Sequence, residues 1–154
     1  MAGTRAEALL RGLRRMARAL RLDRRTASSG TDEECAADPR KSLGAAGEQA
    51  VVAYLKKHRH KILARNYTCR CGELDIVARD GEVIVFVEVK TRRPDPMFDP
   101  ARTVTAAKRR KVRQVARHYL RACNMVDRVC RFDIASVILP EEGEPQINLI
   151  ENAF

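Results

Sequence analysis

Residues 72–90 read GELDIVARDGEVIVFVEVK, two largely apolar runs on either side of Asp80-Gly81. An Asp-Gly pair between such runs is typical of a two-residue type I′ turn, because that turn needs a positive φ at both central positions. The segment therefore predicts a β-hairpin with Asp80 and Gly81 as its loop. In that register, the cross-strand pairs are Arg79 with Glu82, Val77 with Ile84 and Asp75 with Phe86.

The side chains of this hairpin divide between two faces, because successive residues of a strand point to opposite sides. One face is expected to be wholly apolar: Leu74, Ile76, Ala78, Val83, Val85, Val87 and Val89. The other face carries the charged side chains of Glu73, Asp75, Glu88 and Lys90. The β-carbons of Asp75 and Glu88 should lie about 7 Å apart. Two carboxylates at that separation can bind one divalent cation, and Mg²⁺ favours oxygen ligands of this kind.

Lys90 would lie beside such a cation. A lysine there can orient an attacking water, accept its proton, or stabilise charge that develops in a transition state. The same residues also allow a structural interpretation, in which Glu73, Glu88 and Lys90 form a salt-bridged cluster on a solvated face. Residue spacing alone leaves both interpretations open.

The bulk composition describes one basic domain of 154 residues with a net charge of +10. That charge favours a polyanionic partner, either nucleic acid or an anionic membrane surface. No apolar run is long enough to span a bilayer. The cysteine count is odd, at five, and there is no secretory signal, so a reducing, cytoplasmic location is expected.

Residues 1–40 differ from the rest of the chain and are expected to form a basic extension and linker, flexible or helical. Arginines and leucines recur there at helical spacing, and a segment rich in Ser, Asp and Glu follows. Three roles remain open: a disordered arm that adds affinity for nucleic acid, an organelle transit peptide, or a helix on a membrane surface. Residues 41–154 form the expected folded domain.

The folded domain is expected to be an α/β structure of the order α-β-β-β-α-β. Apolar periodicity predicts helices over residues 43–58 and 103–123. Strands are predicted over residues 62–68, over both arms of the hairpin, over residues 131–139 and, more weakly, over residues 146–150. This order predicts a central mixed β-sheet flanked by helices.

The second helix is strongly basic and has no acidic residue between positions 103 and 121. Solvated helix faces usually mix both signs of charge, so this helix is predicted to bind nucleic-acid phosphates, which positions DNA without reading its sequence. The residues assigned to this contact are Lys108, Arg109, Lys111 and Arg113, together with Arg92 from the preceding strand.

Several segments together carry a resemblance to a known family. They are Gly47-Glu48, Arg65-Asn66-Tyr67, residues 72–78, residues 86–92 and Arg131-Phe132-Asp133. In these segments the chain resembles the YraN family, small bacterial proteins with the restriction-endonuclease-like fold of PD-(D/E)XK nucleases, which are similar to archaeal Holliday-junction resolvases.

The resemblance implies a role for each matching residue. Asp75 and Glu88 match the two metal-binding acids, Lys90 matches the lysine of the E-x-K element, and Glu48 matches an additional acid that supports the metal or the water. It also implies Mg²⁺ as cofactor, with Mn²⁺ as a substitute. Two departures are visible: Leu74 stands where the formal motif has proline, and residues before Leu43 lie outside the family pattern.

The leading hypothesis is therefore a metal-dependent DNA endonuclease that hydrolyses phosphodiester bonds, with branched or otherwise structured DNA as a candidate substrate. The alternative is a non-catalytic nucleic-acid-binding protein that retains the nuclease fold. A homodimer is expected only by analogy, because resolving a four-way junction needs two active sites.

Overall fold

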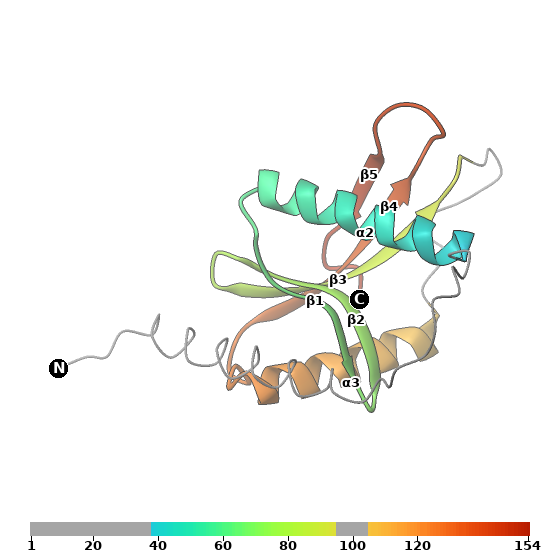
Figure 1. The fold of residues 1–154 in the computed structure, drawn as a ribbon. Coiled ribbons are helices and arrows are strands. Elements are labelled where there is room, and N and C mark those ends of the chain that lie inside the picture. The colour runs from blue at the N-terminus through green and yellow to red at the C-terminus, as the bar shows by residue number, and fades with distance from the viewer. Residues whose placement is uncertain (1–37, 95–104) are drawn as a thin grey trace, which may run out of the picture.

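The computed structural model describes residues 38–94 and 105–154, so the basic extension expected over residues 1–40 lies almost wholly outside the described residues. The described chain forms three layers, with a five-stranded sheet between helix α2 (Pro39–Lys57) and helix α3 (Ala106–Ala122) (Figure 1). The strands are β1 (Lys61–Cys69), β2 (Gly72–Asp80), β3 (Val83–Arg92), β4 (Cys130–Ile138) and β5 (Gln146–Ile150).

The sheet is mixed and follows the chain order β1-β2-β3-β4-β5. Neighbouring strands are antiparallel except β3 and β4, which are parallel. Parallel neighbours need a long crossover, and the segment that contains α3 provides it. The α/β fold with a central mixed sheet flanked by helices is thereby confirmed.

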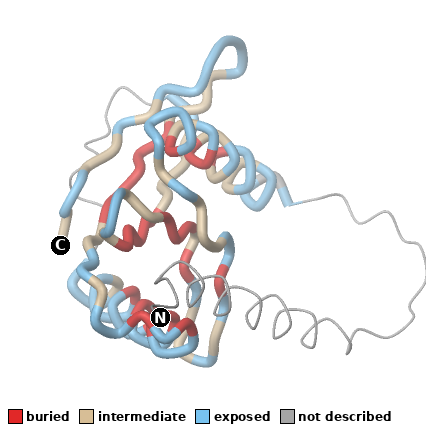
Figure 2. Tube along the Cα trace, turned by 90° about the vertical axis from the view of Figure 1, so that its left-hand side faces the viewer, coloured by how far each residue is buried: buried red, intermediate tan, exposed pale blue. Residues whose placement is uncertain are grey.

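Each face of the sheet has its own apolar core. Val51, Val52 and Leu55 of α2 pack on one face, and Val112, Val115 and Tyr119 of α3 pack on the other. Buried residues accordingly follow the middle of the sheet and the inner side of both helices (Figure 2). Among the helices in the described ranges, none is both long and apolar enough to cross a membrane.

Helix α2 begins four residues earlier than its apolar periodicity predicts. The Asp38 carboxylate caps it by accepting a hydrogen bond from the Arg40 backbone N–H at 3.0 Å, and Pro39 occupies the first turn. Proline suits that position because the first helical N–H groups have no intrahelical acceptor. Arg40 therefore belongs to the folded domain and not to the preceding extension.

The predicted hairpin exists, but its turn is displaced by one residue. Asp80 pairs with Val83, so the loop is Gly81-Glu82 and not Asp80-Gly81. Gly81 provides the positive φ, at 54°, in the first loop position. Asp80 stays in the strand, where its carboxylate accepts a hydrogen bond from Arg131 of β4 at 3.2 Å. The loop keeps two residues, so odd positions of β2 still face even positions of β3.

Leu74 does not lie on the apolar face where the sequence predicts it. Leu74 packs with Val77 in the core beneath α3, while Ile76 packs in the core beneath α2. Residues three apart in a regular strand point to opposite faces, so β2 must bend between Leu74 and Val77. Across from this bend, β1 has Asn66 at a φ of 48°, a conformation that interrupts regular alternation. Asp75 lies at the bend.

Candidate metal-binding and catalytic site

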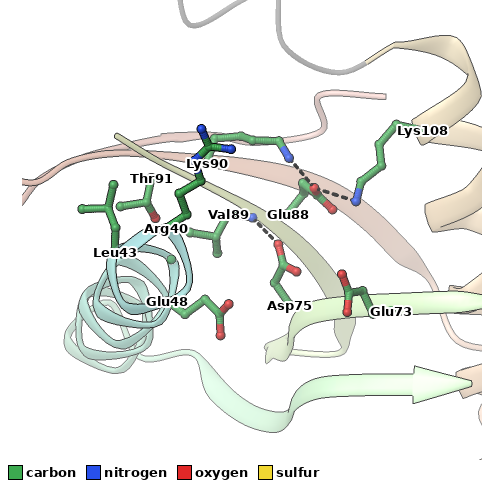
Figure 3. Close-up of a pocket in the computed structure, with 11 residues that line it drawn as sticks. Arg40, Leu43, Glu48, Glu73, Asp75, Glu88, Val89, Lys90, Thr91 and Lys108 are labelled. Carbon is green, nitrogen blue, oxygen red and sulfur yellow. Dashed lines mark hydrogen bonds and ion pairs between the residues drawn. The ribbon is translucent and has the colours of Figure 1, made fainter. Parts of the chain in front are cut away.

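A pocket of about 450 Å³ opens where α2, the ends of β2 and β3, and the start of α3 meet. Its lining includes all four residues predicted to be catalytic: Glu48, Asp75, Glu88 and Lys90. Lys108 reaches the same pocket from α3 (Figure 3). The elements bring these side chains together from positions as far apart as the first helix and the second.

The acidic pair lies where the pairing of β2 with β3 stops. The last cross-strand pair on this side is Ile76 with Val87, and Asp75 and Glu88 are the next residues on their strands. The Asp75 carboxylate accepts a hydrogen bond from the Val89 backbone N–H at 2.8 Å, through Oδ2. The Asp75 carboxylate therefore accepts a hydrogen bond that a backbone carbonyl of the sheet would otherwise accept. Regular pairing between β2 and β3 ends here, and Asp75 lies near Glu88. The two carboxylates are close enough for the charge of Glu88 to act on Asp75.

Glu88 is a buried carboxylate, only 4% exposed, that two lysines neutralise. The ammonium groups of Lys90 and Lys108 lie 2.7 and 3.0 Å from the same oxygen, Oε1. Burial would lower the pKa of Lys108, but its hydrogen bond to Glu88 and the charges of Glu88, Asp75 and Glu73 raise it overall. Buried charges require partners of this kind, because desolvating an unpaired ion is costly.

The charged form of Asp75 is destabilised by its surroundings. Burial, followed by repulsion from Glu88, raises the pKa of Asp75 from its ordinary 3.8 to about 6, although the Val89 hydrogen bond and the charge of Lys108 oppose the shift. Glu48 adds a smaller repulsion, and its carboxylate points from α2 toward Asp75 (Figure 3). Adjacent carboxylates that repel each other are stabilised by a bound cation.

This pKa predicts an unusual pH dependence of stability for the protein in EDTA. The folded state binds the Asp75 proton more tightly than the unfolded state, so the free energy of unfolding should fall as pH rises from about 4 to about 6. Asp75→Asn removes this cost and should be more stable than the wild type by up to about 3 kcal/mol at pH 7.5. Urea unfolding of both proteins between pH 4 and pH 8 measures the difference. A difference that does not vary with pH would show that the Asp75 pKa is not raised.

The basic residues of α3 have different neighbours. Lys108 faces the pocket, while the guanidinium groups of Arg109 and Arg113 lie 5.7 and 5.8 Å from the ring centre of Phe154. Arg113 also lies 5.9 Å from the ring centre of Phe132. Both arginines thus lie beside Phe154 near the end of the chain, and neither lines the pocket.

The remaining two predicted phosphate contacts lie elsewhere again. Lys111 is exposed, and its aliphatic chain passes close to Gly72 at the start of β2. Arg92 is half-buried at the end of β3, where its backbone carbonyl accepts a hydrogen bond from the Leu139 N–H. Neither residue lines the pocket, and their contact with nucleic acid stays a prediction.

Sequence reasoning missed two features of the site. Arg40 lines the pocket, although the expected folded domain begins at residue 41. The Asp38-Pro39 pair is the sequence signal for the true start of the helix. The contact between Lys108 and Glu88 was also missed, and no local pattern could have indicated it. It depends on where α3 returns to the sheet.

The fold and the pocket together define an α/β protein with two acids and two lysines in one pocket, next to the point where β2 and β3 stop pairing. The model of the uncharacterised protein family UPF0102 matches residues 47–137, which include most of this pocket. The chain belongs to the UPF0102 family.

Relatives in this family match most of the chain. A UPF0102 protein of Geobacter metallireducens is 48% identical over 114 residues, which cover 74% of this chain and 93% of that protein. A UPF0102 protein of Pelotomaculum thermopropionicum is 41% identical over 119 residues, covering 77% of this chain and 99% of the relative. A third, of Symbiobacterium thermophilum, is 44% identical over 112 residues, covering 73% and 95%.

Proposed function

We propose that the protein is a metal-dependent endonuclease that hydrolyses phosphodiester bonds in DNA, with branched or structured DNA as the candidate substrate. One observation carries the proposal: Asp75, Glu88 and Lys90 converge in one pocket, from adjacent strands, at the point where the sheet opens. Structural salt bridges do not need a pocket of about 450 Å³ in front of them.

The donor set suits Mg²⁺. Within residues 38–94 and 105–154, no three His, Cys, Asp or Glu side chains group closely enough to form a complete metal cage. Mg²⁺ does not require one, because it commonly binds one or two carboxylates and keeps several waters. Asp75 and Glu88 would hold the ion, with Glu48 supporting it or an attached water, and Mn²⁺ should substitute. When bound, such an ion lowers the pKa of an attacking water and neutralises charge on the phosphate.

The protein's own residues supply the remaining requirements. Lys90 places its ammonium group at the pocket, where it can orient the attacking water and stabilise the phosphate as charge develops. The net charge of +10 attracts DNA to the surface and does so without regard to sequence. A protein with these two features would recognise the phosphate backbone of its DNA substrate more than the base sequence.

The resemblance to the YraN family supports the same proposal. It implies the restriction-endonuclease-like fold of PD-(D/E)XK nucleases, and the α-β-β-β-α-β order with acids on two adjacent central strands is compatible with it. We further propose a cytoplasmic protein, in line with the free thiols of Cys69, Cys71 and Cys130, and a homodimer when the substrate is a four-way junction.

A second candidate function is a nucleic-acid-binding protein without catalysis. It is favoured by the two lysines on Glu88, because such a site is already neutralised without any metal. Calorimetry with Mg²⁺ and Mn²⁺ separates the two functions. The nuclease proposal predicts binding that Asp75→Asn weakens at least about tenfold, since it removes one of two charged ligands. Equal binding by both proteins, or none by the wild type, would favour the non-catalytic protein.

A further inference from the structure

Two ammonium groups share one carboxylate oxygen in the pocket. Glu88 Oε1 lies 2.7 Å from Lys90 Nζ and 3.0 Å from Lys108 Nζ, while the Glu88 side chain is 3% exposed. The lysine side chains are about one-third exposed on the pocket side. One buried negative charge is thus held by two positive charges that can reach solvent.

We propose that Lys108 holds Glu88 in the metal-free protein and, once a divalent cation takes its place, donates its ammonium group to a substrate phosphate. This inference rests on the proposed function, because the phosphate that Lys108 would bind belongs to the proposed DNA substrate. It makes Lys108 a substrate-binding residue of the pocket and couples its position to metal binding.

A divalent cation that binds Glu88 must displace at least one of the two ammonium groups that contact it. A divalent ion and an ammonium group within about 4 Å repel each other strongly where water is partly excluded. Lys90 and Glu88 lie two residues apart on one face of β3, so their contact follows from the strand itself. Lys108 reaches Glu88 from α3, across the pocket (Figure 3). Lys108 can therefore leave without a change in the sheet, while Lys90 stays beside Glu88 on the same face of β3.

A released Lys108 stays at the pocket. It is in the first turn of α3, whose start is fixed by the Thr105 hydroxyl accepting a hydrogen bond from the Lys108 backbone N–H at 3.3 Å. Its flexible side chain can move while its backbone stays in place. An ammonium group binds phosphate oxygens well as a point charge, so a phosphodiester beside the acidic pair is a suitable new partner.

The test compares Lys108→Met with Lys111→Met, which removes the same charge one turn further along the same helix. Calorimetry with Mn²⁺ should show about tenfold tighter binding for Lys108→Met than for wild type, because the competing cation is gone. Lys111→Met controls for the general loss of positive charge and should bind Mn²⁺ within about twofold of wild type. Lys108→Arg keeps the charge and should also resemble wild type.

Affinity for a short duplex DNA gives the second readout. With Mn²⁺ present, Lys108→Met should weaken DNA binding more than Lys111→Met does, whereas in EDTA the two variants should weaken it equally. Equal Mn²⁺ affinity in Lys108→Met and Lys111→Met would overturn the proposal, as would equal loss of DNA binding in both conditions. If Lys108→Met does not fold, Lys108→Gln answers the same question with a polar side chain.

These measurements separate this inference from the proposed function. Tighter Mn²⁺ binding by Lys108→Met, without DNA cleavage by the wild type, would support the coupling and contradict the nuclease proposal. Cleavage by the wild type, with unchanged Mn²⁺ affinity in Lys108→Met, would do the reverse.

Discussion

Replacing Glu88 with glutamine is expected to lower Mg²⁺-dependent DNA cleavage by about a thousandfold or more, the scale of losing a principal electrostatic group of an active site. Glutamine keeps the shape of the side chain but loses the charge that would hold the cation. The fold should survive, because Lys90 and Lys108 are each about one-third exposed and can turn to solvent. Initial rates of nicking at saturating Mg²⁺ measure the effect, and circular dichroism checks the fold.

Glu82→Gln provides a matched control for this change. Glu82 is an exposed acid in the turn that begins β3, and its partner is Arg128. Losing an exposed ion pair should change the free energy of unfolding by less than about 1 kcal/mol and leave the cleavage rate unchanged. Cleavage that persists in highly purified Glu88→Gln protein would remove Glu88 from the catalytic site.

Gly47→Ala is expected to destabilise the protein by about 3 kcal/mol, at the upper end of the range for overpacking. An added β-carbon would collide with the Thr91 hydroxyl and would lie 2.7 Å from Thr91 Cβ. The Thr91 β-carbon is fixed to the backbone of β3, so α2 itself must move away from the sheet. Since Glu48 and Lys90 are the neighbours of these two residues, the pocket should widen and bind Mn²⁺ more weakly.

Gly44→Ala tests whether that loss comes from contact and not from helix glycine in general. Gly44 lies one turn earlier in α2, and nothing lies within 4 Å of an added β-carbon. This variant should be more stable than wild type by about 0.5–1 kcal/mol, because alanine is the better helix former. Thermal unfolding of both variants decides the matter. A stabilised Gly47→Ala protein would show that there is room for a β-carbon between Gly47 and Thr91, contrary to the close packing of α2 on β3.

The sequence predicted the faces of the central hairpin because any two-residue loop keeps odd positions of β2 on the same face as even positions of β3. Moving the two-residue loop from Asp80-Gly81 to Gly81-Glu82 changes which residues pair, but Asp75 and Glu88 stay on the same face. A loop of three residues would have separated them. The shared face of Asp75 and Glu88 was therefore predictable from alternation, while their exact cross-strand neighbours were not.

Prediction failed where a tertiary feature overrides a local rule. Leu74 does not share the face of Ile76 as expected, because β2 bends opposite Asn66 and alternation assumes a regular strand. The contact between Lys108 and Glu88 depends on the placement of α3, which comes from its packing on β1 and β2. A lysine that looked like one of several phosphate contacts thus proved to lie beside the buried acid of the pocket.

We propose that Asp75, Glu88 and Lys90 form a metal-dependent nuclease site, and cleavage of a panel of DNA substrates is the decisive measurement. Wild-type protein and Glu88→Gln are each incubated with four-way-junction, single-stranded and linear duplex DNA, in Mg²⁺, in Mn²⁺ and in EDTA. The proposed function predicts that wild-type protein cleaves at least one substrate with either metal, and that EDTA or Glu88→Gln abolishes this cleavage. No cleavage of any substrate by folded, metal-loaded wild-type protein, or equal cleavage by Glu88→Gln, would contradict it.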